Sequence, residues 1–116
     1  MRRRLLLVGA LYALSACATP EQRGQKLYAG HGCAACHGAE GHADGPSATR
    51  LDAPPRDFAD PRAYSSGASP VDIARSIRRG AGAMPPFRDL TEQEASDIAM
   101  WIVSQQRRSP APDGAR

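Results

Sequence analysis

Two cysteines and a histidine stand within five residues of one another, in the run Cys33-Ala34-Ala35-Cys36-His37. On a helix, two thiols three positions apart lie on neighbouring parts of one turn, which takes about 3.6 residues. Thiols at this spacing can add to the two vinyl groups of a haem, and the histidine is then held beneath the iron as an axial ligand. C-x-x-C-H is the pattern of c-type haem attachment. The run therefore predicts one covalent haem c per chain, bonded to Cys33 and Cys36 and ligated by His37.

Three other uses of this run fit the sequence less well. A thioredoxin-like C-x-x-C motif would need a βαβ pattern around it, which the sequence lacks. A structural zinc site needs four ligands, but the chain has no second cysteine pair, and the neighbours Cys36 and His37 do not easily face one ion. A simple disulfide would leave His37 without a role.

The first residues have the character of an export signal. Arg2, Arg3 and Arg4 precede an almost wholly apolar run over residues 5–14. This run is too short to span a bilayer, which takes about 20 apolar residues. We therefore interpret residues 1–16 as a secretory signal peptide rather than as a buried helix of the fold.

A lipid anchor is the second expectation from this region. Leu14-Ser15-Ala16-Cys17 resembles the lipobox of bacterial lipoproteins, in which cleavage leaves the cysteine first and acylated. The resemblance implies lipidation of Cys17, and two or more acyl chains hold stably because each buried CH₂ contributes about 0.8 kcal/mol. We expect the chain to be lipid-anchored on the periplasmic side of a bacterial membrane. The alternative is an ordinary cleavable signal and a soluble periplasmic protein.

The charge balance gives no support for nucleic-acid binding. The formal charge of +3 comes from 15 basic and 12 acidic residues, and loss of Arg2, Arg3 and Arg4 with the signal would leave equal numbers of each. A near-neutral domain has no general attraction for nucleic acid. The sequence also contains no Ser/His/Asp set, phosphate-binding loop or catalytic carboxylate pair, so we expect neither enzyme activity nor a small-molecule substrate.

A first helix is expected over residues 21–29, and no strand is expected. Residues 38–69 are rich in Gly, Pro, Asp and Ser without a sustained period, which predicts a long loop. Such a loop is unusual inside a compact domain, but a haem would give it a surface to pack on. A haem would also enlarge the apolar core of a small domain that has few aromatic residues.

Capping residues predict two further helices. One begins after Ser69, with Pro70 in its first turn, and ends at Gly80. The last helix begins with a capping box of Thr91 and Glu94. Apolar residues three or four apart give each helix a buried face, namely Ile73 and Ile77 in the former and Ile98, Trp101 and Ile102 in the latter.

Over residues 21–106 the chain resembles the small bacterial cytochromes c called class I. Besides the attachment run, four residues are similar to those at the crossing of the terminal helices in that family: Gly24, Tyr28, Ile98 and Trp101. We expect Trp101 to lie close to the backbone of Gly24. The resemblance implies an all-α cytochrome c fold of three to five short helices around one haem. The expected divisions are a signal peptide at 1–16, a lipidated tether at 17–23, the cytochrome c domain at 24–106 and a disordered tail at 107–116.

The resemblance also implies a second axial ligand. Met84, within the run at 82–87, looks like the methionine of the family's ligand loop. A thioether suits a low-spin haem iron, and His/Met ligation raises the reduction potential. The resemblance further assigns Pro46 a carbonyl that accepts from the other ring N–H of His37, and such bonds fix the ring and tune the metal.

Two histidines compete with Met84 for the ligand role. His31 and His42 stand so close to the attachment run that neither easily reaches the opposite haem face. We expect both at the surface. Met100 falls off the apolar face of the last helix and is expected to be ordinary filler of the interior.

The expected function is one-electron transfer in the cell envelope. The alternatives are a haem subunit of an envelope dehydrogenase or oxidase complex, and a ligand-binding haem sensor or peroxidase. Redox partner proteins are expected in either of the first two cases. A basic face could steer an acidic partner or could simply be solvated, and it consists of Arg75, Arg78, Arg79 and Arg88.

Overall fold

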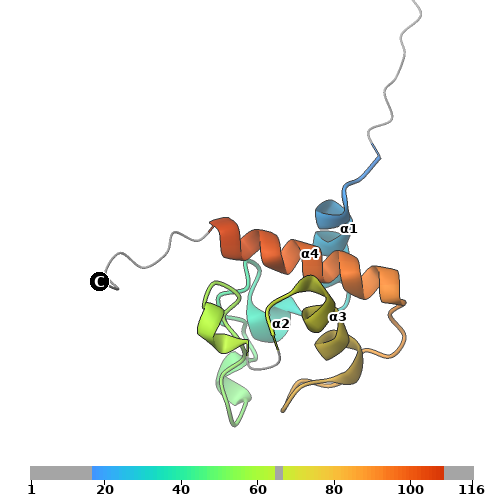
Figure 1. Ribbon diagram of the computed structural model, residues 1–116. Coiled ribbons are helices and arrows are strands. Elements are labelled where there is room, and N and C mark those ends of the chain that lie inside the picture. The colour runs from blue at the N-terminus through green and yellow to red at the C-terminus, as the bar shows by residue number, and fades with distance from the viewer. Residues whose placement is uncertain (1–16, 65–66, 109–116) are drawn as a thin grey trace, which may run out of the picture.

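The computed structural model describes residues 17–64 and 67–108, so the predicted signal peptide and most of the predicted tail lie outside the described residues. In chain order the elements are α1 (Pro20–Gly30), α2 (Ala34–His37), the 3-10 turns η1 (Ala48–Arg50) and η2 (Pro61–Ala63), α3 (Pro70–Arg79) and α4 (Glu92–Arg108). Over these residues there is no strand, only an isolated bridge between Ala81 and Met84. The predicted all-α fold is confirmed (Figure 1).

The crossing of α1 and α4 is the main helix–helix contact. A Cβ on Gly24 would collide with the carbonyl of Asp97 and would lie 2.9 Å from the Ile98 nitrogen. The backbone of α4 itself therefore occupies the space that a side chain would need. The atoms that a Gly24 Cβ would meet first belong to the backbone of Asp97 and Ile98, and the Trp101 ring packs on Tyr28, with ring centroids 4.3 Å apart.

Helix α1 begins earlier than expected because its first turn is fully capped. Gln22 N–H donates to the Thr19 hydroxyl at 3.2 Å, and Thr19 N–H donates to the Gln22 side chain at 2.9 Å. Pro20 occupies the first helical position, where its missing N–H costs nothing. The helix therefore begins inside the segment predicted as a tether, residues 17–23.

Helix α3 has the predicted ends and the predicted buried face. The Ser69 hydroxyl accepts from Asp72 N–H at 3.2 Å, and Gly80 ends the helix with a φ of 81°, a conformation that favours glycine. Ile73 and Ile77 are both buried.

Helix α4 also follows its predicted signals. Thr91 N–H donates to the Glu94 carboxylate at 2.8 Å and Glu94 N–H donates to the Thr91 hydroxyl at 3.1 Å, which completes the capping box. The helix runs on to Arg108, two residues into the predicted tail.

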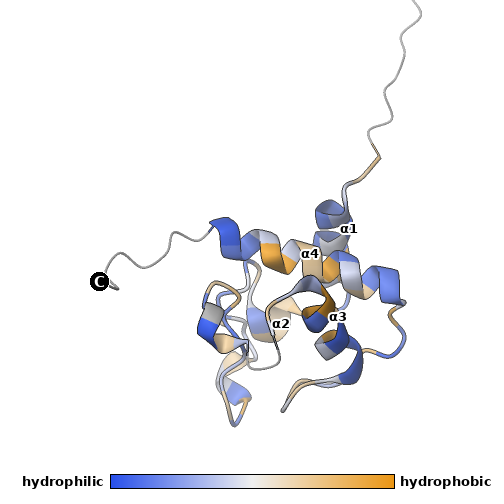
Figure 2. Cartoon of the chain, in the orientation of Figure 1, coloured by the Kyte–Doolittle hydropathy of each residue, from blue (hydrophilic) through white to orange (hydrophobic). Residues whose placement is uncertain are grey.

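The core forms where α1, α3 and α4 meet part of the long loop. Figure 2 shows the most hydrophobic colour on α3 and the middle of α4, whereas both ends of α4 are hydrophilic. Within the described part of the chain, no helix is both long and apolar enough to cross a bilayer. The buried apolar residues are Tyr28, Phe58, Tyr64, Ile73, Ile77, Leu90, Ala95, Ile98, Ala99, Trp101 and Ile102.

Candidate haem site

The attachment run forms one helical turn. Cys33 stands at the N-cap of α2, and His37 N–H donates to the Cys33 carbonyl at 3.0 Å. Gly38 ends the turn with a φ of 84°. Both Cys33 and Cys36 are free thiols and half-buried, and burial raises the pKa of Cys33. The turn thus presents two unpaired sulfurs, followed at once by an imidazole.

One nitrogen of the His37 ring is already engaged. Its Nδ1 lies 3.0 Å from the carbonyl oxygen of Arg56. Because a carbonyl can only accept, Nδ1 must carry the proton, which leaves Nε2 with a free lone pair. The Phe58 ring stacks on the imidazole at 4.8 Å between centroids. Burial lowers the pKa of His37, which favours the neutral ring that a metal requires.

The carbonyl that receives this bond is not the one that was expected. Pro46 is exposed, and its two neighbours bond to α2: Gly45 N–H donates to the Cys36 carbonyl at 3.2 Å and Ser47 N–H donates to the Ala35 carbonyl at 2.8 Å. The prediction of a Pro46 partner for His37 is therefore wrong in this structure. Arg56 supplies the bond instead, directly after Pro54 and Pro55, whose rings fix the backbone φ. Nothing in the sequence spacing indicated that Arg56 would meet His37.

Tyr28 holds the other end of the same turn. Its hydroxyl donates to the carbonyl of Gly38 at 2.5 Å, and its ring meets Phe58 edge-on at 6.0 Å between centroids. Burial raises the pKa of Tyr28 far above its usual range, so the hydroxyl keeps its proton. The sequence had placed Tyr28 only at the helix crossing, and nothing in its spacing indicated this second role.

Met84 lies in a tight turn beside the core. Met84 N–H donates to the Ala81 carbonyl at 2.9 Å, and Ala81 N–H donates back to the Met84 carbonyl at 3.2 Å. Phe87 N–H donates to the Ile77 carbonyl at 3.0 Å, which ties the loop to the end of α3. The half-buried Met84 side chain packs against the hydrophobic core.

The competing histidines lie elsewhere. His31 follows α1 as its C-cap residue, and the exposed His42 has its Nδ1 3.6 Å from the Asp57 carboxylate. Met100 is half-buried on α4. The described residues bring together no three His, Cys, Asp or Glu side chains that could hold a metal ion, so they offer no zinc site.

These features meet the requirements of a covalent haem. Cys33 and Cys36 would form the thioether bonds, and the free Nε2 of His37 would face the iron. The bound haem would supply a reversible one-electron change at its iron. Phe58, Tyr28 and Trp101 form a contiguous aromatic cluster that reaches His37 through Phe58, with the Phe58 and Trp101 ring centroids 6.5 Å apart.

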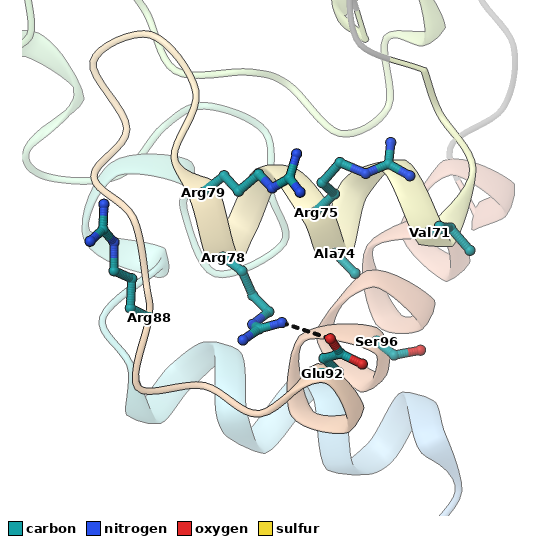
Figure 3. Close-up of a pocket in the computed structure, with 8 residues that line it drawn as sticks. All are labelled: Val71, Ala74, Arg75, Arg78, Arg79, Arg88, Glu92 and Ser96. Atoms are coloured by element: carbon teal, nitrogen blue, oxygen red, sulfur yellow. Dashed lines mark hydrogen bonds and ion pairs between the residues drawn. The ribbon is translucent and has the colours of Figure 1, made fainter.

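The predicted basic face surrounds an open groove of about 910 Å³ between α3, the following loop and the start of α4. Figure 3 shows Arg75 and Arg79 pointing together away from α4, whereas Arg78 points to Glu92. Arg78 pairs with Glu92 at 3.1 Å, and Arg75 pairs with Asp72 at 3.0 Å. Among the described residues no carboxylate pairs with Arg79 or with Arg88, the fourth arginine of the groove.

Comparisons with known proteins identify the kind of domain. A family model described as cytochrome c oxidase, cbb3-type, subunit III matches residues 19–102. A solved structure, the Kuenenia stuttgartiensis reducing HAO-like protein complex Kustc0457/Kustc0458, is similar with a TM-score of 0.68 and 29% identity over 74% of this chain. The match covers 43% of that longer chain. No curated protein matches. Since the family model covers most of the sequence, the chain belongs to this family of c-type cytochrome domains, which bind haem c covalently and transfer electrons.

Proposed function

We propose that this chain is a one-electron carrier of the bacterial cell envelope, with its haem bonded to Cys33 and Cys36 and its iron ligated by His37 and Met84. The observation that carries the proposal is the His37 ring, whose Nδ1 is held 3.0 Å from the Arg56 carbonyl. That bond leaves Nε2 as the one ring nitrogen able to bind iron.

The arrangement of Met84 supports it as the second ligand. Its backbone is closed into a turn with Ala81 by two hydrogen bonds of 2.9 and 3.2 Å, and Pro85 and Pro86 fix the chain that follows. A ligand held this firmly changes position little between the two charge states of the iron. Little rearrangement suits electron transfer, in which no bond to a substrate forms or breaks.

Carbon monoxide binding tests the ligand set. The reduced wild-type holoprotein should resist carbon monoxide near neutral pH, because Met84 blocks the iron. Met84→Ala should bind it rapidly, whereas Met100→Ala is the matched control and should resist like the wild type. Rapid binding by the wild type, or unchanged resistance in Met84→Ala, would contradict Met84 ligation and favour a ligand-binding sensor or peroxidase.

We further propose that acyl chains on Cys17 anchor the domain on the periplasmic side of the membrane. Cys17 is exposed and lies two residues before Thr19, the N-cap of α1, and the lipobox-like run before it supports modification at this residue. Mass spectrometry of the mature N-terminus tests the anchor. An unmodified Cys17, or equal membrane association of Cys17→Ser, would contradict it.

A second candidate role is that of a haem subunit in an envelope oxidoreductase complex. The matching family model is described as an oxidase subunit, and the similar solved structure is a multi-protein complex. In either role the arginines around the groove would meet an acidic redox partner. Purification from the native membrane in mild detergent distinguishes the two roles, since a carrier elutes alone and a subunit elutes with fixed partners.

A further inference from the structure

The residues that follow Cys17 are bonded to the domain from Ala18 onward. The Thr19 side chain and backbone are both tied to Gln22 by the capping box, and Arg23 N–H donates to the Thr19 carbonyl at 3.0 Å. One guanidinium nitrogen of Arg23 also donates to the Ala18 carbonyl at 2.7 Å. Ala18 and Thr19, the two residues between Cys17 and α1, are therefore both bonded to the folded domain.

Arg23 is itself held by the buried carboxylate of Asp97, at the crossing of α1 and α4. Arg23 Nε lies 2.7 Å from one oxygen of Asp97, and a second guanidinium nitrogen lies 3.2 Å from the other. The Asp97 side chain is 4% exposed, and Gln93 of α4 donates to it at 3.0 Å. Arg23 thus joins the N-terminal segment to α4 as well as to α1.

We propose that the hydrogen bonds of Arg23 and the Thr19–Gln22 capping box leave almost no free chain after Cys17. The lipid tether is then too short for the domain to leave the bilayer surface or to tumble on it. The proposal rests on the proposed acylation of Cys17. One residue extends the chain by at most about 3.6 Å, so an anchored Cys17 holds the first turn of α1 at the headgroups. A carrier on a long linker would instead search a wide volume.

The tether leaves the domain on a definite side. In Figure 1 residues 17–19 depart on the side of α4 opposite to α3 and the loop after it. The first turn of α1 near the tether is polar, with Glu21 and Gln22, so this end suits headgroups rather than acyl chains. The side that carries Met84 and the basic groove would then face away from the membrane, toward partners.

Polarised absorption of the haem tests the orientation. The lipidated holoprotein is placed on a supported bilayer, and the dichroic ratio of the haem band is measured. We expect a ratio clearly different from that of randomly oriented haem. A ten-residue Gly/Ser insertion between Ala18 and Thr19 keeps the residues around Cys17 unchanged but should bring the ratio to the random value, whereas the same insertion after Arg108 should leave it as in the wild type.

The outcomes separate this inference from the proposals beneath it. An acylated, membrane-bound wild-type protein with randomly oriented haem would overturn the inference alone, as would an insertion after Ala18 that leaves the dichroic ratio unchanged. A Cys17 without acyl chains would overturn the lipid anchor, and the inference with it. A protein that matures without covalent haem would overturn the haem proposal first.

Discussion

Gly24 of α1 lies directly against the backbone of Asp97 in α4, so that a single added carbon would meet the Asp97 carbonyl. This contact sets how closely the two helices cross. Close approach lets the Tyr28 and Trp101 rings meet at 4.3 Å between centroids, and Tyr28 in turn holds the end of the haem-attachment turn through the Gly38 carbonyl. Helix spacing and the position of the attachment turn are therefore linked.

Gly24→Ala should destabilise the protein strongly. The new methyl group has no free space, because backbone rather than a movable side chain occupies it. Overpacking of this kind costs about 1–3 kcal/mol or more, which corresponds to a fall in Tm of roughly 10 °C for a domain of this size. Thermal unfolding of the holoprotein measures the effect.

Gly30→Ala is the matched control for this substitution. Gly30 is the last residue of the same helix, and a Cβ there would meet no atom within 4 Å. Its Tm should stay close to that of the wild type. Equal losses in the two variants would show that the helix crossing is less tightly packed than the structure indicates.

The ion pair between Arg23 and Asp97 should make stability depend on acid pH. The bonds from Arg23, and then from Gln93, hold the pKa of Asp97 below its usual value against the opposing effect of burial. A lowered folded-state pKa contributes stability that is fully present above the unfolded value of about 3.9. That contribution is lost as pH falls through the folded-state pKa.

Asp97→Asn should therefore be less stable than the wild type at neutral pH, and the difference should shrink as the pH is lowered below about 4. Urea unfolding of both holoproteins across this range measures it. Asp60→Asn is the control, since Asp60 pairs with the exposed Arg62 and exposed pairs contribute little. If the stability difference between Asp97→Asn and the wild type did not change with pH, it would contradict a lowered folded-state pKa for Asp97.

The turn that carries Met84 depends on the glycine that ends α3. Gly80 has a φ of 81°, and a Cβ there would lie 2.9 Å from the Met84 carbonyl and 3.1 Å from the Pro86 nitrogen. We expect Gly80→Ala to displace the turn and to let the reduced haem bind carbon monoxide faster than the wild type. Stopped-flow absorption measures the rate.

Gly82→Ala separates crowding from backbone strain. Gly82 also has a positive φ, 57°, but its Cβ would meet nothing within 4 Å. Both variants bear the strain of a positive φ, about 1–3 kcal/mol, yet only Gly80→Ala pushes on Met84. If both variants bound carbon monoxide equally fast, the contact of Gly80 with the Met84 turn would have no special importance.

The sequence predicted those parts of the fold that local chemistry determines. Ser69 and Thr91 cap their helices as expected because a hydroxyl that accepts from the third backbone N–H after it needs no distant partner. Gly80 ends α3 for a different local reason, since glycine adopts a positive φ without a steric cost. The buried faces of α3 and α4 followed from helical spacing alone.

Apart from the early start of α1 and the late end of α4, the features that the sequence did not predict are contacts between residues well separated in the chain. The partner of His37 stands 19 residues away, at a point that depends on how the long loop folds back, and a proline in a turn gives no measure of that path. The contact of Gly24 with Asp97 depends on the register of two helices. Tyr28 carries a hydroxyl whose partner, Gly38, follows the whole attachment turn.

The arginines of the groove should contribute unequally to the approach of a redox partner. Arg75 and Arg78 are each paired with a carboxylate, which cancels much of their field, whereas Arg79 and Arg88 have no such partner among the described residues. Steering acts through unbalanced charge and is screened by salt. Replacing Arg79 and Arg88 together by Gln should therefore slow reduction or oxidation by an acidic partner, whereas neutral replacement of a whole pair, as in Arg75→Gln/Asp72→Asn, should change the rate little.

Stopped-flow electron transfer at low and high ionic strength measures this difference. The Arg79→Gln/Arg88→Gln protein should be slower than the wild type at low salt and should show a weaker dependence on salt, while the two proteins converge at high salt. Arg62→Gln is the control, since Arg62 lies on η2, outside the groove, and is paired with Asp60. Equal slowing by the control would mean that net charge, rather than this face, governs the encounter. No change in the Arg79→Gln/Arg88→Gln protein would mean that partners dock elsewhere.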